Sequence, residues 1–235
     1  MIQVENLHKS FNGTEVLKGI STTFEKGKTN LIIGQSGSGK TVFLKSLLGL
    51  FTPDSGDIIY DGVKYADMKR KERVALRQKM GMVFQGSALF DSMTVLENVM
   101  FPLKMFSQKT PEEIRERANI VLSRVNLVNA DDKLPSEISG GMQKRVAIAR
   151  AIVNQPNYLF CDEPNSGLDP KTSIVIDNLI QEITEEFNIT TVINTHDMNS
   201  VMEIGAKIVF LKNGYKEWEG TKETIFRTDN EAVTD

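Results

Sequence analysis

The fold of this chain is decided by one stretch, Gly34-Gln-Ser-Gly-Ser-Gly-Lys40-Thr41. It matches the pattern G-x-x-x-x-G-K-[ST], which is typical of a phosphate-binding loop between a strand and a helix. The context agrees, because the apolar run Leu31–Ile33 precedes the loop and Thr41–Leu50 has helical character. A flexible turn of glycine and serine would account for the loop alone, but not for the strand and helix around it.

This stretch has the chemistry of an anion-binding site. Its glycines let the backbone wrap around phosphate oxygens, and the following helix presents unpaired N–H groups and the positive end of its dipole. Lys40 can reach the β- and γ-phosphates of a nucleotide, and the Thr41 hydroxyl can bind Mg²⁺. We therefore expect ATP and Mg²⁺ as ligands. The loop residues expected to hold them are Gly34, Ser36, Gly37, Ser38, Gly39, Lys40 and Thr41.

Strands and helices alternate along the rest of the chain. Strands are predicted at Val16–Phe24, Met80–Gln85, Tyr158–Cys161, Thr190–Asn194 and Lys207–Leu211. Helices are predicted at Lys69–Lys79, Ser173–Phe187 and Asn199–Gly205, with a mainly helical block from Thr94 to about Asn154. This alternation implies an α/β fold with a mainly parallel sheet. We assign residues 1–85 and 155–235 to a core with an N-terminal β subdomain, and residues 86–154 to a helical subdomain.

Composition narrows the classes of function. The net charge of −3 offers no basic excess for nucleic acid, so we expect no nucleic-acid partner. The lone cysteine, Cys161, cannot form an internal disulfide and fits a reducing compartment; we expect it to be a buried apolar side chain. No apolar run approaches the roughly 20 residues that cross a bilayer, so we expect a soluble chain whose membrane role comes through a partner. The acidic tail Thr228–Asp235 is expected to be mobile.

A second chemical signal is the apolar strand that ends in Asp162 and Glu163. A carboxylate at the end of a buried parallel strand is well placed to hold the Mg²⁺ shell, and we assign this role to Asp162. Glu163 could then orient and activate the attacking water, which is typically worth about 10²–10⁴-fold in rate. The alternative, a solvated acidic loop, is disfavoured by the phosphate-binding loop in the same chain.

A third signal is Ser139-Gly140-Gly141-Met142 before an apolar helix, because glycines at a helix start make another anion-binding N-terminus. A chain with one phosphate loop has little need of a second for the same phosphate. A head-to-tail pair of chains resolves this, with each nucleotide held between one chain's loop and the other chain's Ser-Gly-Gly turn. A glycine-rich helix cap without a ligand is the alternative.

These motifs in this order resemble the ABC-type ATPases, whose signature is Ser-Gly-Gly-Gln or a close variant; Met142 departs from the commonest glutamine. The resemblance covers nearly the whole chain and implies a P-loop NTPase fold of ABC type. It implies that Gln85 contacts Mg²⁺ and the water, that His196 contacts the γ-phosphate and that Phe11 stacks on adenine. It also places Asp169, in the run Ser166–Asp169, at the seam between two chains.

A finer resemblance rests on the stretches Gly86–Val99 and Pro135–Met142, which are similar to the ATPases of Mla/Mce-type lipid transporters. It implies transmembrane permease subunits, an Mce-domain lipid-binding protein and phospholipid transport between bacterial membranes. The chain would then lie on the cytoplasmic side of the inner membrane, held there by the permease. Two differences are Gly86-Ser87 where that group often has Ser-Gly, and Asn165 where it often has Thr.

Other functions stay open on the sequence. The ATPase of another ABC system, such as an amino-acid importer or a cell-division system, shares the chemistry and differs in its partner. A non-transport ABC ATPase typically carries two ATPase domains or a long coiled coil, which do not fit in 235 residues. A binding module without hydrolysis would need a broken acidic site, whereas Asp162 and Glu163 are both present.

Overall fold

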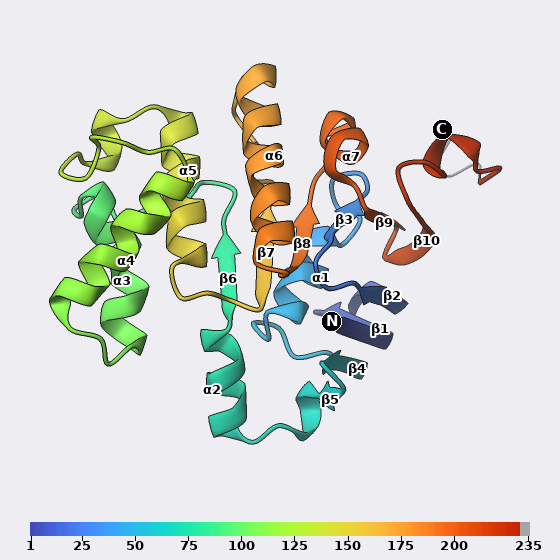
Figure 1. Ribbon diagram of the computed structural model, residues 1–235. Coiled ribbons are helices and arrows are strands. Elements are labelled where there is room, and N and C mark those ends of the chain that lie inside the picture. Colours follow the sequence, from blue (N-terminus) through green and yellow to red (C-terminus); the bar gives the residue numbers. More distant parts are fainter. Residues whose placement is uncertain (231–235) are drawn as a thin grey trace.

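The computed structural model describes residues 1–230 and contains a six-stranded, mainly parallel sheet that carries the nucleotide loop (Figure 1). The strand order is β10-β9-β3-β8-β7-β6, and only the β9–β10 pair is antiparallel. The strands are β3 (Thr29–Ile33), β6 (Met80–Val83), β7 (Tyr158–Asp162), β8 (Thr190–Asn194), β9 (Lys207–Lys212) and β10 (Tyr215–Gly220). The predicted α/β class with a mainly parallel core is confirmed.

The N-terminal region forms a separate four-stranded antiparallel sheet in the order β2-β1-β4-β5. Its strands are β1 (Ile2–Phe11), β2 (Thr14–Phe24), β4 (Ser55–Tyr60) and β5 (Val63–Lys64). Apolar side chains of this sheet pack with those of α1 (Lys40–Leu47) and of the core strands in one cluster, so the β sheet and the nucleotide loop share a core.

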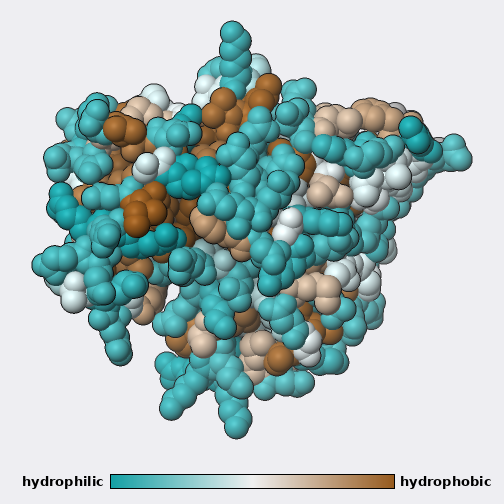
Figure 2. Space-filling view, in the orientation of Figure 1, coloured by the Kyte–Doolittle hydropathy of each residue, from teal (hydrophilic) through white to brown (hydrophobic). Residues whose placement is uncertain are grey.

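Helices cover the sheet and build a block at one side of it (Figure 1). The helices beside the sheets are α2 (Arg70–Gln78), α6 (Pro170–Glu186) and α7 (Met198–Ile204), with short 3₁₀ turns at Tyr65–Asp67, Pro135–Glu137 and Ile225–Arg227. The side block consists of α3 (Val95–Phe106), α4 (Pro111–Arg124) and α5 (Gly140–Ile152). Figure 2 shows hydrophobic colour gathered over this block and beside α6, on an otherwise mainly hydrophilic face. The subdomain boundaries near residues 85 and 154 stay a prediction.

Several predicted boundaries were wrong for local reasons. Helix α6 begins at Pro170, earlier than the predicted Ser173, because the Asp169 carboxylate accepts hydrogen bonds from the backbone N–H groups of residues 171 and 172 and Pro170 suits a first helical turn. Helix α1 stops at Leu47, and Gly49 adopts φ +68°, a left-handed geometry that ends helices. Strand β6 stops at Val83, before the predicted Gln85.

Burial agrees with the expectation for the cysteine, because the Cys161 side chain is fully buried and its burial raises the pKa of the thiol. Across residues 1–230, none of the helices combines the length and the apolar character needed to cross a bilayer. Residues 231–235, which make up most of the tail predicted to be mobile, lie outside the described residues.

Candidate functional site

The loop between β3 and α1 has a backbone that requires glycine. Gly34 adopts φ +148°, and a Cβ atom there would collide with the carbonyl oxygen of Leu211. Gly39 precedes α1 with φ +104°, and no side chain caps the helix at this position. The first N–H groups of α1 are therefore left for a ligand, as the sequence predicted for an anion site.

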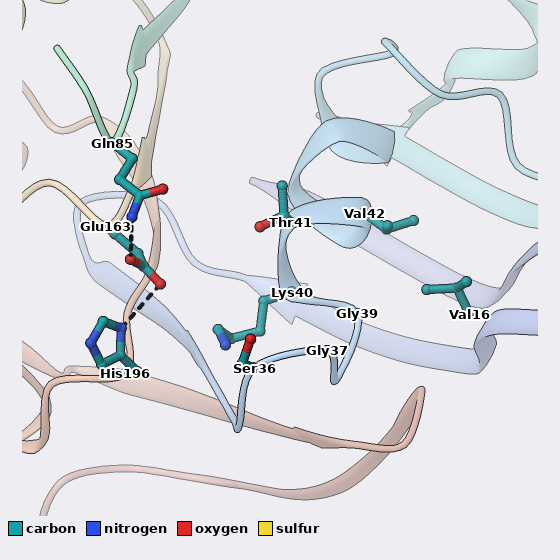
Figure 3. Close-up of a pocket in the computed structure, with 10 residues that line it drawn as sticks. All are labelled: Val16, Ser36, Gly37, Gly39, Lys40, Thr41, Val42, Gln85, Glu163 and His196. Carbon is teal, nitrogen blue, oxygen red and sulfur yellow. Dashed lines mark hydrogen bonds and ion pairs between the residues drawn. The ribbon is translucent and has the colours of Figure 1, made fainter. Parts of the chain in front are cut away.

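A cavity of about 680 Å³ lies against this loop (Figure 3). Its lining residues are Val16, Ser36, Gly37, Gly39, Lys40, Thr41, Val42, Gln85, Glu163 and His196. One wall is the loop with the start of α1, and the other wall is formed by side chains that follow β6, β7 and β8. The carboxyl ends of parallel strands meet at one edge of the sheet, which brings residues distant in sequence to one cavity.

The opposite wall is a hydrogen-bonded group of three side chains that sequence analysis had assigned to catalysis. The Gln85 amide nitrogen donates to Glu163 Oε2 at 2.9 Å, and His196 Nδ1 lies 3.0 Å from Glu163 Oε1. Glu163 itself adopts φ +47°, a left-handed conformation that is uncommon outside glycine, asparagine and aspartate. The structure brings the three groups together; their catalytic roles stay a prediction.

Lys40 links the two walls electrostatically. Its ammonium group donates to the backbone carbonyls of Gly34 at 2.7 Å and Gln35 at 3.1 Å. Burial lowers the pKa of Lys40, and the negative charges of Glu163 and Asp162 act in the opposite direction. Lys40 and Glu163 line the cavity, and Asp162 lies behind its wall, close enough to influence Lys40. A cation near two carboxylates is an arrangement suited to a ligand that carries both phosphate and a metal ion.

The polar groups of the site match those that bound Mg-ATP requires. Within residues 1–230, the Ser38 hydroxyl oxygen is buried without a hydrogen-bond partner, in the loop that would surround the phosphates. Thr41 lines the cavity with a hydroxyl oxygen, and Asp162 carries a carboxylate at the end of β7; both are oxygen groups of the kind that Mg²⁺ prefers, and their role as its ligands stays a prediction. The described residues contain no group of three or more His, Cys, Asp or Glu side chains able to hold a metal by themselves. Mg²⁺ is usually bound by one or two protein groups plus substrate phosphates.

The Ser-Gly-Gly turn lies away from this cavity. Ser139 caps α5 through its Oγ, which accepts from the backbone N–H of Met142 at 3.3 Å, and neither these residues nor Gly140 and Gly141 line the cavity. Asp169 caps α6 instead, and hydrogen bonds from Thr172 and the α6 backbone lower the pKa of its carboxyl. These five predicted ligands thus lie outside the chain's own nucleotide cavity; a role for them in a second chain's site stays a prediction.

Phe11 is also absent from the cavity lining. Its ring packs edge-on against Phe51 at 5.1 Å, and Lys9 Nζ lies 5.2 Å from its centroid. The adenine-stacking role stays a prediction. The other histidine, His8, lies on the surface of the β sheet, where its Nδ1 is 2.7 Å from Glu15 Oε1.

Two residues at the site escaped the sequence analysis. Lys144, on α5, is 4% exposed and donates from Nζ to the backbone carbonyl of Gln85, while burial lowers the pKa of the lysine. Asn194, at the end of β8, is fully buried and donates to Asp162. Asn194 carried a signal, because it is a strongly polar residue at the end of a strand that is buried throughout, whereas Lys144 stands between Gln143 and Arg145 and carried none.

Comparison with known proteins gives one consistent family. The family model described as "ABC transporter" matches residues 17–166. The "Probable ribonucleotide transport ATP-binding protein mkl" of Mycobacterium tuberculosis is 37% identical over 232 residues, which is 99% of this chain and 65% of that protein. The "Methionine import ATP-binding protein MetN" of Carboxydothermus hydrogenoformans is 41% identical over 237 residues, covering 100% of this chain and 70% of that protein. The chain thus spans about two thirds of these relatives.

Two solved structures share the fold. A dimeric post-hydrolysis state of the ATP-binding cassette MJ0796, bound to ADP and Pi, gives a TM-score of 0.85 at 34% identity, covering 94% of this chain and 99% of that one. The structure of cbiO1 from Clostridium perfringens, described as part of the transporter complex cbiONQ, gives 0.88 at 34% identity, covering 97% and 91%.

Proposed function

This chain belongs to the ABC transporter family, as a domain that binds and hydrolyses ATP with Mg²⁺, and from that premise we propose that it works as a head-to-tail pair beneath a membrane permease. One observation carries the proposal. The Gln85–Glu163–His196 group faces the nucleotide loop across a single cavity, whereas the Ser139–Met142 turn lies outside it. One chain therefore supplies most of a hydrolytic site and exposes a further phosphate-binding turn for a second copy.

The loop between β3 and α1 binds the phosphates of the nucleotide. Lys40 and the backbone N–H groups at the start of α1 hold the phosphates, and the free Ser38 hydroxyl gains a partner when a phosphate fills the loop. Thr41, Asp162 and Gln85 would hold Mg²⁺, which when bound neutralises phosphate charge and orients the γ-phosphate.

Hydrolysis requires a positioned base. Glu163 accepts a proton from the water that attacks the γ-phosphate, and its two oxygens are held by Gln85 and His196. The strained backbone of Glu163 persists because its own N–H donates to the Asn194 carbonyl at 3.0 Å. The carboxylate is therefore fixed before the nucleotide arrives.

The second copy completes the cage around the γ-phosphate through Ser139 and Gly141 at the N-terminus of its α5. Loss of the γ-phosphate removes the charge that joins the two chains, so the pair loosens. A permease bound to both chains changes conformation with them.

A groove beside α3 is a candidate docking site for the permease. It has a volume of about 310 Å³ and includes Phe84, Phe90, Phe101, Phe106 and Arg150 in its lining. Met105 and Phe106, at the end of α3, are 59% and 57% exposed. An amphipathic helix of the permease is the occupant that such a groove accepts.

For the cargo, we propose phospholipid moved between bacterial membranes, with an Mce-domain protein as a further partner and the chain on the cytoplasmic side of the inner membrane. This rests on the stretch Gly86–Val99, which flanks the groove. An amino-acid importer is the second candidate, favoured by the 41% identity to a protein named for methionine import.

The test is purification of the chain with its permease from native membranes, followed by reconstitution into vesicles. The proposal expects ATP-dependent transfer of labelled phospholipid, and none in a complex that carries Glu163→Gln. Methionine uptake without phospholipid transfer would support the importer. A chain that purifies with no permease would contradict both.

A further inference from the structure

Asn194 occupies the point where the two catalytic strand ends meet. Strands β7 and β8 run in parallel with Asp162 opposite Asn194. Every residue of β8 is buried, and Asn194, the polar residue at its end, is fully buried as well. A primary amide at such a position requires hydrogen-bond partners.

One half of that amide is used to hold the metal-site carboxylate. Asn194 Nδ2 donates to Asp162 Oδ1 at 3.1 Å, and the backbone carbonyl of Asn194 accepts from the N–H of Glu163 at 3.0 Å. Two residues further on, His196 contacts the Glu163 carboxylate. The end of β8 therefore fixes both acidic residues, Asp162 through its side chain and Glu163 through its backbone.

The other half of the amide has no partner. Among residues 1–230, Asn194 Oδ1 is buried and accepts no hydrogen bond. Its orientation follows from chemistry, because an ionised carboxylate only accepts hydrogen bonds. The amide nitrogen must face Asp162, so the oxygen faces elsewhere. A buried acceptor without a partner destabilises a protein, and each such group requires an explanation.

We propose that Asn194 is a positioning residue of the Mg²⁺ site, whose amide nitrogen orients Asp162 and whose unpartnered buried oxygen is tolerated for that reason. Partners that orient metal ligands commonly change metal affinity when they are replaced. The inference rests on the proposed nucleotide site and deepens it, by naming the residue that orients its metal ligand.

The chain offers a matched control on the same strand. Thr190, at the opposite end of β8, is also fully buried, and its Oγ1 also lacks a partner within the described residues. Thr190→Val and Asn194→Leu each remove an unpartnered buried oxygen from β8, but only the second change lies beside Asp162. Asn194→Val also removes the amide and suits a buried strand.

The experiment measures binding of the analogue AMP-PNP to the full chain by calorimetry, in EDTA and across a Mg²⁺ titration, with thermal unfolding as a check on folding. For Asn194→Leu we expect wild-type affinity in EDTA and a Mg²⁺ affinity lower by about 10- to 100-fold. Thr190→Val should match the wild type in both. If Asn194→Leu does not unfold cooperatively, Asn194→Val replaces it, with the same expected direction.

Wild-type Mg²⁺ affinity in a folded Asn194 variant would overturn the inference and leave the proposed function intact. A wild-type chain whose affinity for AMP-PNP does not respond to Mg²⁺ would instead overturn the proposed nucleotide site, and this inference with it.

Discussion

Helices α1 and α5 both have glycines at their starts, and they differ in what faces their N-termini. Helix α1 follows a loop without a side-chain cap, beside a cavity that holds Lys40 and Glu163. Helix α5 is capped by Ser139 and lies outside the cavity. A glycine-rich helix start is therefore not in itself a site; the surrounding side chains decide it. The side chains that face α1 come from the same chain. We propose that those facing α5 come from a second copy.

The largest effect is expected when the base that faces α1 is removed. In Glu163→Gln, hydrolysis by the assembled transporter should fall by about 10²–10⁴-fold, because the amide cannot accept the proton of the attacking water. ATP binding should persist and the closed pair should accumulate. Steady-state turnover and size-exclusion chromatography with ATP measure the two effects, with the surface change Glu182→Gln as control. Near wild-type turnover would refute the assignment of Glu163.

An aspartate introduced near the start of each helix distinguishes the roles of the two sites. A Cβ at Gly140 would lie 3.7 Å from the nearest atom, Leu168 Cδ2, so Gly140→Asp fits without strain. It should lower turnover by about 10²–10³-fold through repulsion of the phosphate, yet leave ATP affinity of a lone chain unchanged. Ser36→Asp, in the cavity lining, should abolish binding by a lone chain. Equal effects of both changes on a lone chain would break the comparison.

Lys144 joins the two regions, since it lies on α5 and donates to the Gln85 carbonyl beside the α1 cavity. Lys144→Met should lower turnover about tenfold by misplacing Gln85, with little change in ATP affinity. Kinetics that resolve kcat from KM measure this. A rise in KM alone would show that Lys144 acts on binding and not on the position of Gln85.

The smallest expected effect concerns the two serines. Ser139 uses its hydroxyl as a cap, so Ser139→Ala should lower the free energy of unfolding by about 1 kcal/mol. The buried Ser38 hydroxyl has no partner in the described part of the chain, so Ser38→Ala should not destabilise the nucleotide-free protein. Urea unfolding without nucleotide measures both. Equal losses would contradict the different uses of the two hydroxyl groups.

Local patterns predicted the parts of the site that depend on local structure. The nucleotide loop, the strand that ends in Asp162 and the turn before α5 each combine a motif with a strand or helix around it, and the fold class and family followed. Asn194 could not be predicted as a partner of Asp162, because their contact depends on the register between β7 and β8. The left-handed backbone of Glu163 depends likewise on a tertiary hydrogen bond. The cargo is not encoded in the cavity, and it stays a proposal.

The most direct test of the composite site mixes two inactive chains in the assembled transporter. One carries Lys40→Met, and the other carries Gly140→Asp. In a head-to-tail pair of the two, one site contains both defects and the other contains neither. Random pairing should therefore restore about a quarter of wild-type hydrolysis. Activity that stays at the level of the separate variants would contradict the account, because it would mean that each chain's loop and turn serve the same nucleotide.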